Sequence, residues 1–177
     1  MIILDIDLDY FFLPVFSGTL VPENKKDEVY HDAPDSYIDL IQHFNLKNFP
    51  GEIKVFKNHD EVYYELKKLN RKSSLIHVDA HDDVSHSSIK NVDLGNWITH
   101  CVRENLIHPE IFWINQMTSN TYRSEYSVEN KKYFLNTSKL KDFHLKSKID
   151  KIFITKSPEF CPNNNIDIQI IEYIKHF

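Results

Sequence analysis

The chain has 177 residues, 41% of them apolar, and this length suits one domain with its own core rather than two. Its 26 acidic and 21 basic side chains give a formal charge of -5, which argues against nucleic acid or an anionic membrane surface as a partner. The 3 glycines are too scattered for a phosphate-binding loop, and the 2 cysteines form no C-x-x-C pair, which excludes a cysteine-ligated zinc and a disulfide scaffold.

The first residues place acids where a signal peptide needs an apolar stretch, and no later segment approaches the roughly 18 apolar residues of a membrane span. We therefore expect neither export nor membrane insertion, and a reducing, cytoplasmic location. The composition does not determine the oligomeric state, and a homo-oligomer is compatible with it.

Short β-branched runs alternate with segments of helical period, the pattern of an α/β protein. We predict strands at residues 2–7, 53–56, 75–79, 111–114 and 151–155, and helices at 35–44 with Asp35 as the cap, at 60–69 and at 96–102. Residues 166–174 fit either a helix or a strand, and 14–31 and 115–137 are expected to be loops or small excursions. The predicted fold is a three-layer, mainly parallel sheet flanked by helices, in a single domain over residues 1–177.

Two segments combine a strand with acids or imidazoles at alternate positions. These side chains are Asp5, Asp7 and Asp9 in the first segment, and His77, Asp79, His81 and Asp83 in the second. Because side chains alternate along a strand, the polar groups of each segment should share one side of the sheet.

Buried carboxylates need protonation, cationic partners or a metal, and few basic residues lie nearby in the sequence. Mixed Asp and His sets suit Mn²⁺, Fe²⁺ or Zn²⁺, and both segments would end at the carboxyl edge of the sheet, where α/β proteins bind ligands. Turn or helix capping is the competing explanation, mainly for the first segment. The second segment, with three ligand types in five residues from Asp79 to Asp83, favours a metal site.

The run Asp79-Ala80-His81-Asp82-Asp83 resembles the D-A-H-x-D motif of the ureohydrolases, which include arginase and agmatinase, and Asp7-Leu8-Asp9 resembles their D-x-D motif. The segments 7–11, 96–98 and 157–160 look more like an arginase-related family, UPF0489, which includes bacterial peptide arginases. This resemblance implies a compact arginase- or deacetylase-like catalytic domain. It also implies hydrolysis of arginine in a ribosomally made precursor peptide to ornithine and urea.

The same resemblance implies a pair of Mn²⁺ ions and a role for each matching residue. Asp79 and Asp7 would bridge the ions, His81 and Asp9 would bind one ion, and Asp83 and His59 would bind the other. Glu159 would grip the substrate guanidinium.

Collapse of the tetrahedral intermediate requires a proton donor that titrates near neutrality, which points to histidine. His86 and His100 are the candidates closest to the motifs, and His31 could also reach the site. Asp82 should point away from the ligands by strand alternation. Asn96 and Trp97, with Tyr10 or Phe11, could line the mouth of the site and contact the substrate, although Trp97 is equally compatible with core packing.

Alternative functions remain open. The D-x-D segment precedes the D-A-H-x-D segment, the reverse of the order in arginase, so the substrate could instead be free arginine, agmatine or an acyl amide. The first seven residues also resemble the first motif of haloacid-dehalogenase-type phosphohydrolases, with Asp5 as nucleophile and Mg²⁺ as partner. A binding protein with a structural metal site is the non-enzymatic alternative.

Overall fold

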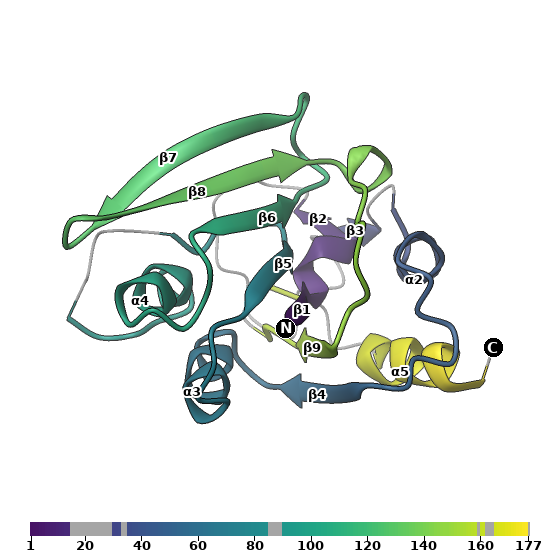
Figure 1. Cartoon of the computed structure of the whole chain (residues 1–177). Coiled ribbons are helices and arrows are strands. Elements are labelled where there is room, and N and C mark those ends of the chain that lie inside the picture. The colour runs from purple at the N-terminus through teal and green to yellow at the C-terminus, as the bar shows by residue number, and fades with distance from the viewer. Residues whose placement is uncertain (15–29, 33–34, 85–89, 159, 162–164, 177) are drawn as a thin grey trace.

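The computed structural model describes residues 1–14, 30–32, 35–84, 90–158, 160–161 and 165–176 (Figure 1). The strands are β1 (Ile2–Asp7), β2 (Phe12–Pro14), β3 (Tyr30–Asp32), β4 (Glu52–Phe56), β5 (Ser74–Val78), β6 (Glu110–Ile114), β7 (Tyr122–Val128), β8 (Lys131–Ser138) and β9 (Lys151–Thr155). The α-helices are α2 (Tyr37–His43), α3 (Asp60–Lys68), α4 (Trp97–Arg103) and α5 (Ile166–His176), and short 3-10 turns cover Leu8–Phe11 and Leu140–Asp142.

A seven-stranded sheet organises the molecule, in the order β4-β9-β1-β5-β6-β8-β7. Every pairing in it is parallel except that of β7 with β8. Strands β2 and β3 form a separate antiparallel pair. Because β4, β9, β1 and β5 are parallel neighbours, the segments that follow them leave the sheet at one edge.

Helices cover both faces of the sheet, as Figure 1 shows: α3 and α4 lie on one face, and α2 and α5 on the other. Alternate side chains of β1 point to opposite faces of the sheet. Ile3 packs with side chains of α3 and α4, whereas Leu4 and Ile6 pack with those of α2 and α5. The predicted three-layer α/β class is therefore confirmed. By the same alternation Asp5 and Asp7 lie on the face of Ile3.

Several local predictions are corrected. The ambiguous segment at 166–174 is the helix α5. Ser36, not Asp35, caps α2: its hydroxyl accepts from the Asp39 N–H, and the Asp39 carboxylate accepts from the Ser36 N–H. Asp35 instead accepts a hydrogen bond from the Tyr10 hydroxyl.

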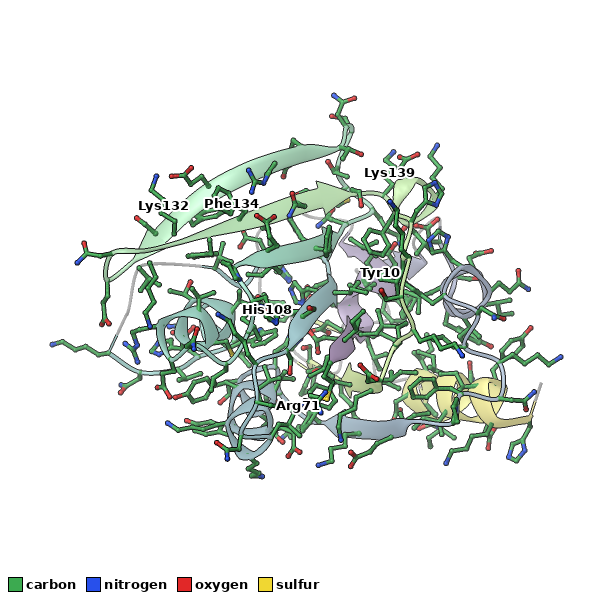
Figure 2. All side chains as sticks on the ribbon, in the orientation of Figure 1. Tyr10, Arg71, His108, Lys132, Phe134 and Lys139 are labelled. Carbon is green, nitrogen blue, oxygen red and sulfur yellow. The ribbon has the colours of Figure 1, made fainter. Side chains whose placement is uncertain are left out.

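The predicted loop at 115–137 was wrong for most of its length, because β7 and β8 form a hairpin there. The guanidinium carbon of Arg123 lies 3.6 Å from the centroid of the Phe134 ring across the two strands, and Figure 2 labels Phe134 on this hairpin. Of the other predicted loop, residues 15–29 lie outside the described part of the chain, and its ends form β2 and β3. Among the described residues, no helix has the length and apolar character needed to cross a bilayer.

Candidate metal centre

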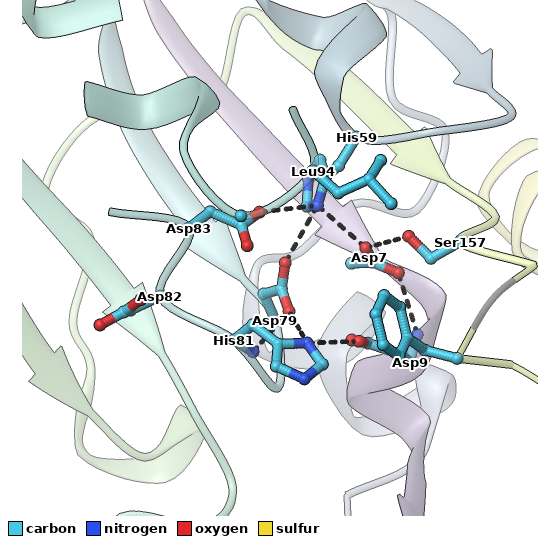
Figure 3. Close-up of a pocket in the computed structure, with 11 residues that line it drawn as sticks. Asp7, Asp9, His59, Asp79, His81, Asp82, Asp83, Leu94 and Ser157 are labelled. Atoms are coloured by element: carbon cyan, nitrogen blue, oxygen red, sulfur yellow. Dashed lines mark hydrogen bonds and ion pairs between the residues drawn. The ribbon is translucent and has the colours of Figure 1, made fainter. Parts of the chain in front are cut away.

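Acids and imidazoles from distant segments meet at the carboxyl edge of the four neighbouring strands β4, β9, β1 and β5 (Figure 3). The cluster contains the six side chains that the sequence predicts as metal ligands: Asp7, Asp9, His59, Asp79, His81 and Asp83. All of them except His81 are almost completely buried.

Local structure explains how the first segment presents its acids. Asp7 ends β1 and caps the 3-10 turn that follows, and its Oδ1 accepts from the Asp9 N–H at 3.1 Å. The tight turn brings Asp9 back beside Asp7, and Asp9 Oδ1 then accepts from the Ala80 N–H at 3.3 Å, beyond the end of β5. The two acidic segments are thus joined directly.

One set of ligand atoms surrounds His59, which stands between β4 and α3. Its Nδ1 lies 2.9 Å from Asp7 Oδ2, 3.1 Å from Asp79 Oδ2 and 3.1 Å from Asp83 Oδ2. We call Asp7, His59, Asp79 and Asp83 the His59 group. These atoms come from the ends of three strands and converge on one point, as Figure 3 shows.

The second set surrounds His81. Its Nδ1 lies 2.8 Å from Asp9 Oδ2 and 3.6 Å from Asp79 Oδ1, and the Asp79 carboxylate also accepts from the His81 N–H at 2.6 Å. We call Asp9, Asp79 and His81 the His81 group. The two groups share Asp79, whose two oxygens face different groups.

Burial and mutual repulsion dominate the electrostatics. Burial raises the pKa of Asp9 well above its ordinary value, and the neighbouring carboxylates of Asp7 and Asp79 raise it further. Burial, followed by the charge of Asp79, also raises the pKa of Asp7 and of Asp83. The nearby carboxylates of Asp79 and Asp9 raise the pKa of His81 to about 11. So many buried carboxylates require positive charge among them.

Two buried carboxylate oxygens without a hydrogen-bond partner indicate that a cation fits this cluster. Asp9 Oδ2 and Asp79 Oδ2 are buried and accept no hydrogen bond of good geometry, although an imidazole nitrogen lies close to each. Ligand atoms around a shared ion approach one another in this way without bonding to one another. Mixed carboxylate and imidazole donors suit transition-metal ions, so these buried clusters could hold metal ions.

A pocket of about 220 Å³ opens onto both groups. Its remaining walls come from Asp82, Leu94, Gly95, Ser157 and Phe160. The volume lies below the roughly 300–1,000 Å³ typical of sites for drug-sized ligands, so the pocket suits the end of a side chain rather than a large cofactor.

Searches of protein-family models, curated proteins and solved structures found no match to this chain. The chemistry of the site is therefore inferred from the geometry of its residues alone.

A third group, formed by Asp5, His59 and His77, lies deeper in the core. Asp5 Oδ2 is 2.8 Å from His59 Nε2 and 2.9 Å from His77 Nδ1, and all three side chains are buried. Burial alone would raise the pKa of Asp5, but the two imidazoles outweigh it and lower that pKa, so Asp5 is a charged acceptor. With its Nε2 donating to Asp5, His59 presents the Nδ1 lone pair to the His59 group. The sequence pattern singled out both residues as polar, but it gave Asp5 a role only as the nucleophile of the phosphohydrolase alternative and gave His77 none.

Three other predicted site residues do not line the pocket. His100 is buried in α4 away from the pocket, where its Nδ1 lies 2.7 Å from an Arg103 nitrogen and its ring packs against Tyr63, so its position gives no support to the predicted role as proton donor. Asn96 is buried, and its side chain binds the backbone of Asn91 and Asp93.

Trp97 is completely buried behind the cluster and does not contact the pocket. Tyr10, labelled in Figure 2, is also buried. The aromatic mouth predicted from these residues is therefore corrected, because the same side chains pack in the core. Asp82 does line the pocket, but it points away from the ligand atoms, as strand alternation predicts (Figure 3).

His86 and Glu159 lie outside the described residues, and so does the side chain of His31.

Two residues that line the pocket, Ser157 and Phe160, were not predicted from the sequence as site residues. Ser157 lies two residues beyond the end of β9, and its hydroxyl donates to Oδ2 of Asp7, the last residue of β1. Phe160 packs against the His81 ring, with the two centroids 5.0 Å apart. The position of Ser157 shortly after a predicted strand was the available signal.

Proposed function

We propose that the chain is a dinuclear-metal hydrolase, best served by Mn²⁺, that converts arginine side chains of a precursor peptide to ornithine and urea. The observation that supports this most directly is the pair of ligand groups that share Asp79 at the floor of one small pocket. A single structural ion would need only one such group, whereas two adjacent groups are typical of hydrolytic dinuclear centres.

The chain's own residues divide the work. Asp7, His59 and Asp83 would hold one cation, and His81 and Asp9 the other. Asp79 would contact both, and a bridging role for Asp7 stays a prediction. Two cations held there would acidify a shared water molecule and so supply a nucleophile at neutral pH. The reaction adds one water to each arginine and releases one urea.

Substrate preference follows from charge and size. The pocket walls contribute five aspartates against two histidines and, among the described residues, no lysine or arginine, which favours a cationic head group such as guanidinium. A volume of about 220 Å³ admits the end of one side chain while the rest of a peptide stays outside. Glu159 as the guanidinium partner and His86 as the proton donor remain predictions.

The phosphohydrolase alternative finds less support. Its nucleophile would be Asp5, which is fully buried, is held by His59 and His77, and does not line the pocket. An attacking carboxylate must reach the phosphorus atom of its substrate, and Asp5 has no such access.

The test is incubation of the Mn²⁺-loaded protein with an arginine-containing peptide and with a matched peptide in which lysine replaces arginine. We expect a mass decrease of CH₂N₂ per processed arginine, stoichiometric urea, and no change in the lysine peptide. Free arginine, agmatine and an acetylated lysine are assayed in parallel. Urea from a free compound but not from the peptide would shift the proposal to a small-molecule ureohydrolase, and acetate release would shift it to a deacetylase. Metal uptake without turnover of any compound would leave a metal-binding protein.

A further inference from the structure

The side chain of Trp97, the first residue of α4, lies directly beneath the His59 group. Its indole Nε1–H donates to Asp83 Oδ2 at 2.6 Å, and both groups are buried. A hydrogen bond to a buried carboxylate is roughly twice as strong as one between neutral partners. Trp97 therefore fixes the position of one oxygen in the His59 group.

The same indole ring packs against His59. The two ring centroids are 5.0 Å apart with the planes tilted by 31°, and the His77 ring meets Trp97 edge-on at 5.6 Å. Since Asp5 holds His59 Nε2 from the other direction, the imidazole is restrained both by a hydrogen bond and by an aromatic face. Trp97 thus contacts two side chains of one group.

Asp83 needs such a restraint. Its backbone has φ 52, in the left-handed region that a residue other than glycine adopts at a cost, and His81 and Asp82, which precede it, lie in an irregular segment. The indole hydrogen bond anchors this segment to α4.

Among the described residues, no indole or helix side chain holds the His81 group in this way. The His81 side chain is 53% exposed, and Phe160 is the ring that packs against it. Its Nδ1 faces Asp9 and Asp79, and in the described part of the chain neither contact comes from an α-helix. A ligand that keeps its rotational freedom loses more entropy when it binds an ion.

We propose that Trp97 is a positioning residue, which fixes Asp83 and His59 and so makes the His59 group the tighter of two cation sites. This inference rests on the proposed function only in its premise that the cluster binds divalent cations. The His81 group then fills second and exchanges its ion more readily.

The test compares Trp97→Phe with Trp113→Phe, because these are the two tryptophans of the chain. Trp113 donates its indole N–H to the main-chain oxygen of Asp79 at 3.0 Å, and Asn115 donates to that same oxygen at 3.2 Å. Trp113→Phe thus removes the same kind of donor but leaves its acceptor satisfied. Trp97→Phe keeps an aromatic ring beside His59 and leaves Asp83 without its donor.

Mn²⁺ is titrated into each metal-free protein, and free Mn²⁺ is followed by electron paramagnetic resonance. We expect two binding events in the wild type, with the tighter one weakened about 10- to 100-fold by Trp97→Phe and the weaker one unchanged, since loss of an outer partner typically costs that much affinity. Trp113→Phe should bind like the wild type. Equal weakening of both events, or of neither, would overturn the inference. A wild-type protein that takes up no Mn²⁺ would instead remove the proposed function.

Tryptophan fluorescence gives a second readout that does not depend on the folding of Trp97→Phe. In Trp113→Phe the sole indole is Trp97, so its emission reports on the His59 group. We expect the first equivalent of Mn²⁺ to cause most of the change in emission. A change that arrives mainly with the second equivalent would assign the tighter site to the His81 group and contradict the inference.

Discussion

The Ser157 hydroxyl donates a hydrogen bond to Asp7 Oδ2 across 150 positions of sequence, and this bond joins the end of β9 to the end of β1. Ser157→Ala removes a donor from a buried carboxylate that the His59 group uses. We expect Mn²⁺ affinity to fall about 10-fold, in line with other losses of partners that orient a ligand. Calorimetric titration measures the change.

The backbone at Ser157 supplies a matched control. Its φ of 39 lies in the left-handed region, where glycine is favoured over alanine by roughly 1 kcal/mol. Ser157→Gly and Ser157→Ala both lack the hydroxyl, so both should lose metal affinity, but the glycine variant should unfold at higher urea concentration. Equal stability of the two variants would argue against strain at this position.

Asp79 is shared by the two ligand groups, and Asp7 contributes to one of them. We expect Asp79→Ala to abolish metal uptake and turnover, and Asp7→Ala to do the same. Asp82→Ala is the control, because Asp82 lines the same pocket but points away from the ligand atoms. Metal content measured by mass spectrometry after Mn²⁺ loading and desalting checks all three. Retained metal in Asp79→Ala would remove that residue from the centre.

The sequence predicts the central strands well. Strands β1 and β9 have the predicted bounds because each is a mainly apolar run that lies inside the sheet. The β7–β8 hairpin escapes prediction because β7 is mostly polar and largely solvent-exposed. Its turn gives no glycine signal either, since Glu129 and Asn130 adopt the positive φ values of 46 and 66 there.

The convergence of the aspartates is also predictable, because alternation along a strand and the common edge of parallel strands fix where Asp7 and Asp79 point, whereas His59 was placed with them by the family resemblance. The proposed role of Trp97 cannot be predicted from the sequence. Every residue of α4 from Trp97 to Val102 is buried, so helical periodicity does not reveal which face meets the cluster. Only the packing of α4 against the sheet places the indole beside Asp83.

Gly51, just before β4, has almost no room for a side chain. A Cβ atom there would lie 2.5 Å from the main-chain oxygen of Asp150 and 2.4 Å from the Phe49 ring. We expect Gly51→Ala to destabilise the fold by about 1–3 kcal/mol through overpacking, measured by urea denaturation. Gly95→Ala is the control, since the nearest atom to its Cβ would be Asp93 Oδ1 at 3.9 Å. Similar losses in both variants would contradict the steric explanation.

The buried charges make the stability of the metal-free protein depend on pH. Burial lowers the pKa of His77, but Asp79 and Asp5 outweigh it and raise that pKa to about 9, and the nearby carboxylates of Asp79 and Asp9 raise the pKa of His81 to about 11. A histidine with a raised pKa stabilises the fold fully below its unfolded value, about 6.5, and this contribution is lost as the pH rises through the folded value. In chelator, the free energy of unfolding should therefore fall as the pH rises from about 6.5 through the two folded values, about 9 for His77 and about 11 for His81.

The variant Asp9→Asn tests whether the Asp9–His81 pair contributes to this loss of stability with rising pH. The change removes one of the two carboxylates that raise the pKa of His81, and it also removes a carboxylate whose own pKa is raised by burial and by its neighbours. We expect the variant to show a shallower decline in stability over the same pH range, and to lose Mn²⁺ at the His81 group while it keeps binding at the His59 group. Urea denaturation in chelator at both ends of the range measures the slope, with Asp82→Asn as the control, because Asp82 lines the pocket but points away from the cluster. A decline as steep as in the wild type would show that the Asp9–His81 pair is not its source.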